Sequence, residues 1–276
     1  SEIEIYLNSS KSESNRLLII KSLSDNQIDL ENLSKANDTI LLKNLIRSNS
    51  QNIWDTEDAG TTMRFLTSYL ALKKEGVLLT GTKRMKKRPI KVLVNALNEI
   101  GAKISYKEID GFPPINIDKK IYQNKVSISI RGDISSQYIS SLLMIAPILP
   151  NGLTIEIIPP FYSRPYVMMT LNLMKKFGIE YYLSNDTISI KNQQYKEGKY
   201  KIESDWSAAS YWYSIISINK YIKEIKLKGL RSESFQGDQV IKKIMSLFNI
   251  ETINDTDGII LRKKGFDCDY LELDFK

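Results

Sequence analysis

The chain has 276 residues, of which 42% are hydrophobic and 26% are charged. These fractions match ordinary globular proteins, so they exclude disordered and fibrous classes and allow one large domain or two smaller ones. The formal net charge is +7, but the lysines are dispersed among isoleucine and asparagine, which favours a compositional bias over a nucleic-acid-binding surface. No apolar run is long enough to span a bilayer, and the first residues lack the layout of a signal peptide, so we expect a cytoplasmic protein.

Histidine is absent, and Cys268 is the single cysteine. One thiol cannot form an internal disulfide, and without histidine it supports neither a zinc site nor a Cys–His dyad. Any general acid or base must therefore be a carboxylate, a lysine or a tyrosine.

The predicted elements begin with a strand at residues 3–7 and helices at residues 14–24 and 38–48, which form a less regular first unit. A helix that starts with small residues then recurs at residues 59–64, 135–138 and 207–210. From Gly60 to Ser136 is 76 positions, and from Ser136 to Ala208 is 72. One spacing thus relates all three copies, which indicates an internal repeat.

A second, amphipathic helix recurs in the same register, at residues 88–101, 164–178 and 237–249. Its copies end at Gly101, Gly178 and Asn249. Glycine and asparagine are the two residue types that most easily adopt the left-handed conformation that closes a helix. Between helices we predict strands, and each period contains about four of them. Their positions are residues 77–81, 126–131, 153–158, 187–190, 225–229, 258–262 and 270–276. The pattern predicts an α/β (α+β) fold in which each repeat packs helices on one face of a small sheet.

Residues 9–16 (SSKSESNR) lie between the first strand and an apolar helix, and they favour an anion site. The start of a helix carries unpaired backbone N–H groups and a partial positive charge. Lys11 and Ser12 lie at that start, and Arg16 lies one turn later on the same face. The alternative is an ordinary serine-rich helix cap with solvated cations.

The same combination of small residues and cations returns at residues 58–64, 83–89, 132–137 and 162–166. Gly60 has no Cβ, so a ligand can approach its backbone closely. Arg88 and Arg164 each precede a proline suited to the first helical turn, and an arginine fork fits carboxylate and phosphate groups. Repeated at one period, these groups converge if the repeats pack around a pseudo-symmetry axis. Asp205, by contrast, is predicted to cap a helix.

In these motifs the chain resembles the EPSP synthase family of enolpyruvyl transferases. Six motifs occur in family order: residues 11–16 (KSESNR), 59–64 (AGTTMR), 81–89 (GTKRMKKRP), 135–137 (SSQ), 163–166 (SRPY) and 236–238 (QGD). The resemblance implies an inside-out barrel of six βαβαβ-type units in two domains. Residues 1–203 would form the N-terminal substrate-binding domain, and residues 204–276 an incomplete second domain.

The resemblance also implies transfer of an enolpyruvyl group from phosphoenolpyruvate to the 5-hydroxyl of shikimate 3-phosphate, by a monomer without metal or organic cofactor. Lys11 would be catalytic and would contact both substrates. The residues implied for shikimate 3-phosphate are Lys11, Ser12, Arg16, Ser135, Ser136, Gln137, Ser163 and Tyr166. Those implied for phosphoenolpyruvate are Lys11, Gly60, Arg88 and Gln137.

The chain departs from the family pattern in two ways. Asp58 stands where the family commonly has asparagine. The family's catalytic aspartate, its Lys–Glu pair, a histidine-bearing arginine motif and a last lysine are expected beyond Lys276, so we expect a truncated form, a fragment whose remainder is a separate chain, or a degenerate relative. Turnover by the chain alone is then not expected. Two other hypotheses are an enolpyruvyl transferase acting on UDP-N-acetylglucosamine and a non-catalytic anion-binding relative.

Overall fold

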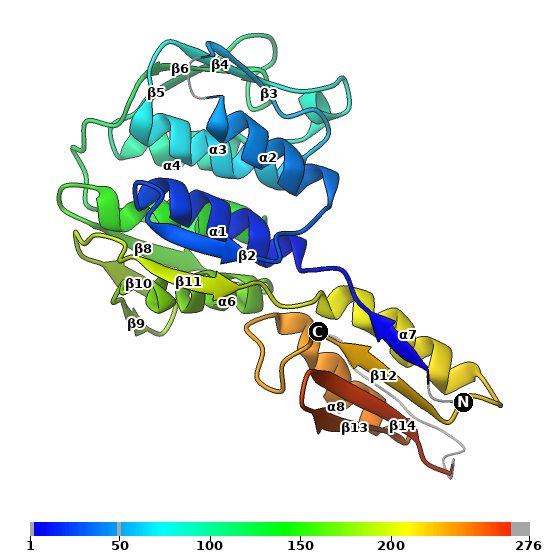
Figure 1. The fold of residues 1–276 in the computed structure, drawn as a ribbon. Helices are drawn as coiled ribbons and strands as arrows, with labels where there is room; N and C mark the ends of the chain where they lie inside the picture. Colours follow the sequence, from blue (N-terminus) through cyan, green and yellow to red (C-terminus); the bar gives the residue numbers. More distant parts are fainter. Residues whose placement is uncertain (1–2, 49–50, 266–276) are drawn as a thin grey trace. The chain divides into compact units, whose positions relative to one another are not determined.

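The computed structural model describes residues 3–48 and 51–265, which fall into two compact units (Figure 1). The larger unit comprises residues 11–202, and the smaller unit comprises residues 3–10 and 203–265 among those described. The predicted first domain of residues 1–203 therefore differs from the larger unit mainly at its start, because the first ten residues group with the smaller unit. The predicted strand at 270–276 and Cys268 lie outside the described residues.

One topology occurs twice in the larger unit. A strand and a helix are followed by a parallel strand, a second helix and two antiparallel strands, which gives the sheet orders β3-β4-β6-β5 and β7-β8-β10-β9. The first copy consists of β3 (Ile53–Asp55), α3 (Gly60–Lys73), β4 (Val77–Thr80), α4 (Lys91–Glu99), β5 (Lys103–Tyr106) and β6 (Ile115–Lys119). The second consists of β7 (Ser127–Arg131), α5 (Ser136–Ile145), β8 (Leu153–Ile158), α6 (Arg164–Lys176), β9 (Tyr182–Ser184) and β10 (Thr187–Ile190).

Two strands exchange places between the units. β1 (Glu4–Tyr6) precedes α1 (Lys11–Leu23), and β11 (Gly198–Lys201) precedes α7 (Trp206–Ile218). By the rule of the other repeats each would pair with the strand that follows its helix. Instead β1 pairs in parallel with β12 (Glu224–Lys228), and β11 pairs in parallel with β2 (Ile28–Glu31).

The smaller unit repeats the same topology once more, with the sheet order β1-β12-β14-β13. Its remaining elements are a 3-10 turn (Gly237–Val240), α8 (Ile241–Ser246), β13 (Ile250–Asp255) and β14 (Gly258–Lys263). α7 packs on the sheet through Trp206, Ala209, Tyr213 and Ile216, whose spacing follows one face of a helix. Asp205 caps α7 by accepting hydrogen bonds from the backbone of Ser207 and Ala208, which confirms the predicted cap.

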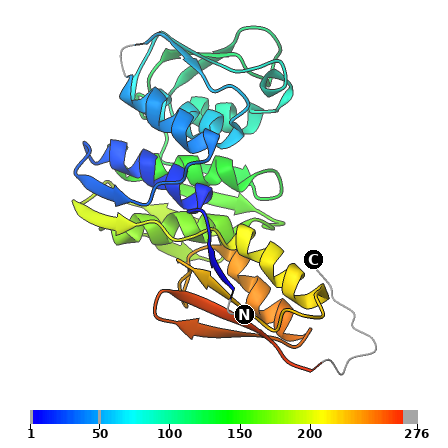
Figure 2. The same ribbon diagram turned by 45° about the vertical axis from the view of Figure 1, so that its right-hand side comes forward.

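The helices of the larger unit form its core. α1, α3 and α5 contact one another, and α2 (Asn37–Arg47), α4 and α6 pack beside them. In Figures 1 and 2 the sheet of β3 to β6 lies on the outer side of these helices. Between α3 and α5 the hydroxyls of Ser68 and Ser141 are hydrogen-bonded at 2.8 Å, so the small residues of these helices permit close packing.

The predicted helix ends are confirmed by positive φ angles of 114° at Gly101, 82° at Gly178 and 56° at Asn249. One prediction about a helix start is wrong. Pro165 lies in the first turn of α6, but Pro89 precedes α4, which begins at Lys91. The backbone at Arg88 is extended, as expected before a proline, and the backbone N–H of Ile90 donates to Gly111 instead of starting the helix.

Candidate functional site

The start of α1 carries the first predicted site residue, Lys11. Its Nζ lies 3.5 Å from Oδ2 of Asp38, the second residue of α2. α1 begins three residues earlier than predicted, so Lys11 and Ser12 are in its first turn. Asp38 was not predicted as a site residue, although an acidic residue at a helix start was visible in the sequence.

Gly60 and Arg88 meet at the start of α3. A Cβ on Gly60 would lie 2.1 Å from Nη1 of Arg88, so any larger residue would displace the guanidinium from its present position. The close approach predicted for a ligand at Gly60 is therefore made by an arginine of the chain itself. Burial lowers the pKa of Arg88, as do the nearby charges of Arg64 and Arg84, whereas Asp38 raises it.

Gln137 links the starts of two helices. Its Nε2 donates to Oγ1 of Thr61 in α3 at 3.1 Å, and its backbone N–H donates to Oγ of Ser135, the N-cap of α5, at 3.3 Å. Ser136 follows in the first turn of α5 and is 8% exposed. The AGTTMR and SSQ motifs, 76 positions apart, are thus brought together as the repeat predicted.

Arg16 is almost fully buried, at 3% exposure, and lies among α1, α5 and α6. Its Nε donates to Oγ1 of Thr170 at 2.7 Å, and Nη1 donates to the carbonyl of Ser12 at 3.0 Å. Nη2 donates to Oγ of Ser140 at 3.3 Å and to the carbonyl of Tyr166 at 3.4 Å. Burial lowers the pKa of Arg16 to about 10. Arg16 therefore ties three helices together at the position where Ser12 and Tyr166 lie.

The last motif lies at the start of α6. Ser163 occupies the N-cap position without a capping hydrogen bond from its side chain, and Tyr166 is half-buried in the first turn. Arg164 does not join these groups, because its Nη1 lies 3.7 Å from Oδ1 of Asp186. All ten predicted site residues belong to the larger unit. The structure adds Asp38, Thr61, Arg64, Ser140 and Thr170 as their direct neighbours, and Tyr138 as a neighbour of Arg64.

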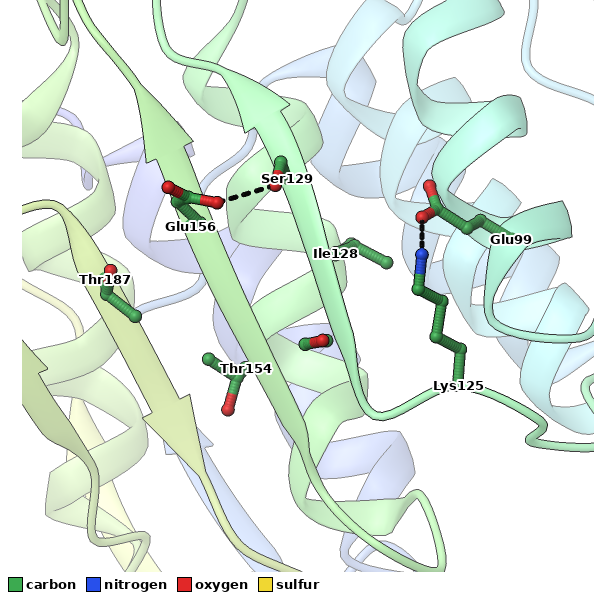
Figure 3. Close-up of a pocket in the computed structure, with 8 residues that line it drawn as sticks. Glu99, Lys125, Ile128, Ser129, Thr154, Glu156 and Thr187 are labelled. Atoms are coloured by element: carbon green, nitrogen blue, oxygen red, sulfur yellow. Dashed lines mark hydrogen bonds and ion pairs between the residues drawn. The ribbon is translucent and has the colours of Figure 1, made fainter.

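A separate pocket of about 490 Å³ lies on the outer face of the sheet of β7, β8 and β10 (Figure 3). Hydroxyl groups line it, and Ser129 donates to Glu156 at 2.7 Å. Its single cation, Lys125, is paired with Glu99. With two carboxylates and one paired lysine, this pocket is poorly suited to an anion, and none of the predicted site residues lines it.

Within residues 3–48 and 51–265, no group of three or more histidine, cysteine, aspartate or glutamate side chains is arranged to hold a metal ion. None of the helices in that part of the chain is both long and apolar enough to cross a membrane.

Comparison with known proteins gives a consistent result. The family described as EPSP synthase (3-phosphoshikimate 1-carboxyvinyltransferase) matches residues 42–274. A 3-phosphoshikimate 1-carboxyvinyltransferase of Bacteroides fragilis is 43% identical over 98% of this chain, and one of Histophilus somni is 35% identical over 96%. The chain spans 66% and 68% of the length of these relatives. A solved EPSP synthase from Acinetobacter baumannii superposes with a TM-score of 0.78 at 16% identity, covering 95% of this chain and 64% of that one, which supports the fold.

Proposed function

Because the chain belongs to the EPSP synthase family, we propose that it binds shikimate 3-phosphate and phosphoenolpyruvate for enolpyruvyl transfer between them. The observation that carries the proposal is the meeting of five separate motifs at the starts of α1, α3, α5 and α6 and at Arg88. Both substrates carry phosphate, and phosphoenolpyruvate carries a carboxylate as well. Lys11 at the start of α1 and the arginines of the cluster suit such ligands, because each supplies charge-assisted hydrogen bonds.

We assign the two substrates to neighbouring parts of this cluster. Shikimate 3-phosphate would lie along Ser12, Arg16, Ser135, Ser136, Ser163 and Tyr166. Phosphoenolpyruvate would lie at Gly60 and Arg88, and Lys11 and Gln137 would reach both ligands. The contacts within the cluster support this division, since Arg16 contacts Ser12 and Tyr166, whereas Arg88 packs on Gly60.

Lys11 is assigned as a catalytic residue. It is the first residue of α1, and its side chain is 45% exposed, so its ammonium group is accessible to a ligand. Its ion pair with Asp38 at 3.5 Å is long enough for an anionic substrate to replace it. An ammonium group there would stabilise negative charge that develops as the carbon–oxygen bond to phosphate breaks.

Isothermal titration of the chain with shikimate 3-phosphate tests the substrate assignment. We expect saturable binding that weakens with salt, because charged contacts dominate it. Ser136→Ala should weaken binding, and Arg16→Lys should weaken it as well, because Arg16 holds Ser12 and Tyr166 in place. Ser127→Ala, at an exposed serine on the outer sheet, is the matched control and should bind like the unmodified chain. Binding of UDP-N-acetylglucosamine in place of shikimate 3-phosphate would contradict the assignment.

A second experiment measures turnover, as the release of phosphate from phosphoenolpyruvate. We infer that a polypeptide of these 276 residues binds shikimate 3-phosphate but does not release phosphate. Proton transfer to the methylene carbon and from the attacking hydroxyl needs placed acids and bases. Adding the segment of the Bacteroides fragilis relative that this chain does not match should produce phosphate release. A high rate of release without that segment would overturn this inference.

A further inference from the structure

Within residues 3–48 and 51–265, Arg64 is a buried arginine without a carboxylate partner. It is the fifth residue of α3 and is 7% exposed. Its Nη1 donates to the carbonyl of Gly60 at 2.8 Å, but its Nε has no hydrogen-bond partner. No ion pair joins it to an acidic side chain in the described part of the chain. Burying an unpaired charge is costly, so a position of this kind calls for a reason beyond packing.

Tyr138 connects Arg64 to the loop that carries Arg88. The Arg64 guanidinium lies 5.6 Å from the centre of the Tyr138 ring, within the range of a cation–π interaction. The Tyr138 hydroxyl donates to the carbonyl of Pro89 at 2.5 Å. Tyr138 is 2% exposed, so this link between α3, α5 and the loop has little freedom to move.

Gly60 is the point where the two guanidinium groups meet. Arg64 binds its carbonyl, and Arg88 occupies the space where a Cβ would be. The two positive charges oppose each other, and of the nearby groups Asp38 and, to a smaller extent, Tyr138 favour the charged form of Arg88. An anion beside Gly60 would relieve this repulsion, so the pair is arranged to favour a bound anion over an empty site.

We propose that Arg64 is a positioning residue of the anion site at Gly60. Together with Tyr138, whose hydroxyl binds the carbonyl of Pro89, it fixes the loop that carries Arg88, and its unopposed charge raises the affinity of that site for a phosphate group. The inference rests on the proposed function for the identity of the natural ligand, phosphoenolpyruvate. The existence of the anion site does not depend on the proposed function, and inorganic phosphate can test it.

Inorganic phosphate titrated into the 15N-labelled chain at low salt provides the test, with the chemical shift of the Gly60 amide as the readout. The unmodified chain should show a saturable shift. Arg64→Met should raise the phosphate concentration at half-saturation at least about tenfold, Arg64→Lys should restore part of the loss, and Tyr138→Phe should raise it about threefold. The matched control is Arg262→Met, at an exposed arginine of the smaller unit paired with Glu224, and it should leave the midpoint unchanged.

Shikimate 3-phosphate affinity, measured on the same variants, separates positioning from a general structural role. It should stay within about twofold of the unmodified chain, because its assigned residues Ser12 and Tyr166 contact Arg16 rather than Arg64, whereas structural damage would weaken both ligands. If Arg64→Met does not fold, as its spectrum will show, Arg64→Lys and Tyr138→Phe decide the question. An unchanged midpoint in the folded variants, or no saturable shift at Gly60 in the unmodified chain, overturns the inference. Failure of shikimate 3-phosphate to bind the unmodified chain would instead count against the proposed function.

Discussion

α3 and α5 in the larger unit and α7 in the smaller unit begin equivalent repeats, yet their burial differs. In α3 every residue from Thr62 to Ala71 is buried, and in α5 every residue from Tyr138 to Ile145 is buried. In α7 only Trp206, Ala209, Tyr213 and Ile216 are buried. The difference follows from the neighbours, because α3 and α5 contact each other and α1, and α5 also contacts α6, whereas α7 contacts its sheet and α8.

A second apolar stripe on α7 is exposed, and it is formed by Tyr211, Ile215 and Ile218. These residues are spaced four and three apart, so they lie on one face of the helix. The repeat therefore encodes helices with two apolar faces, of which α3 and α5 bury both and α7 buries one. The smaller unit is therefore stabilised by the one buried face of α7 on its sheet and by polar contacts, and the contribution of each can be measured separately.

The largest effect is expected in the helix core of the larger unit. Leu66 on α3 is fully buried, so Leu66→Ala should lower the free energy of unfolding of this unit by about 2 to 5 kcal/mol through lost transfer energy and a residual cavity. Urea unfolding followed by the fluorescence of Trp54 reports on this unit, in a background where Trp206 and Trp212 are replaced by phenylalanine. Ile40→Ala, on the exposed side of α2, is the control. Similar costs for the two variants would contradict the difference in burial.

The next largest effect concerns a buried carboxylate in the smaller unit. Oε1 of Glu203 accepts from Nε1 of Trp206 at 2.7 Å and from the backbone N–H of Arg231 at 2.8 Å. Oε2 accepts from Oγ of Ser234 at 2.5 Å and from Nε2 of Gln236 at 3.2 Å. Glu203→Gln would place an amide N–H₂ against these last two donors, so we expect a loss of about 1.5 to 3 kcal/mol.

This loss should be confined to the smaller unit. With Trp54 replaced by phenylalanine, Trp206 and Trp212 report on the smaller unit, and its urea midpoint should fall. The midpoint reported by Trp54 should not change. Glu224→Gln, at an exposed carboxylate of the same unit, is the matched control. Equal effects of the two glutamine variants would show that the Glu203 network does not stabilise this unit.

The repeat could be located from the sequence because its signals are local. Apolar spacing and closing residues such as Gly101 and Gly178 depend only on nearby residues, and the structure confirms them. The exchange of β1 and β11 could not be predicted in this way. A short strand such as residues 4–6 contains no information about its partner, which lies more than two hundred residues away at residues 226–228. Tertiary contacts alone decide that pairing.

Within the site, the sequence predicted which residue types gather but not how each is held. Arg16 was expected one turn into a helix on the face of an anion site, and the structure buries it against Thr170 and Ser140, from helices that follow much later in the chain. Asp38 and Tyr138 were missed because neither belongs to a cationic motif. Their contacts with Lys11 and with the carbonyl of Pro89 appear only when α1, α2 and α5 are packed.

Tyr213 provides a smaller, pH-dependent effect on α7. Burial raises the pKa of Tyr213 to about 12, and its hydroxyl is hydrogen-bonded to Oγ1 of Thr252 at 2.6 Å. In the unfolded chain the tyrosine has a pKa near 10, so as pH rises it ionises there before it ionises in the folded unit. The stability that the neutral folded tyrosine contributes below pH 10 is therefore lost as the pH rises towards 12. Tyr213→Phe should therefore cost about 1 kcal/mol at pH 9 and become less destabilising, by about 1 to 2 kcal/mol, near pH 11.5.

Urea unfolding of the smaller unit at several pH values between 9 and 11.5 checks this prediction. Thr252→Val is the matched control, because it removes the same hydrogen bond but keeps the tyrosine that ionises. That variant should retain the decline in stability with pH, whereas Tyr213→Phe should reduce it. The same decline in both variants would mean that another group controls the alkaline stability of this unit.

The smallest effect is expected on the exposed stripe of α7. Ile216 is fully buried and Ile218 is 81% exposed, although both lie on the last turns of one helix. Ile218→Ala removes few contacts and should change the free energy of unfolding of the smaller unit by less than about 0.5 kcal/mol. Ile216→Ala removes a side chain packed on the sheet and should cost about 2 to 5 kcal/mol. Because the two substitutions are chemically identical and two residues apart, their difference isolates burial from helix propensity. A cost for Ile218→Ala close to that of Ile216→Ala would show that this face of α7 is covered in solution, and the contrast with α3 and α5 would then no longer hold.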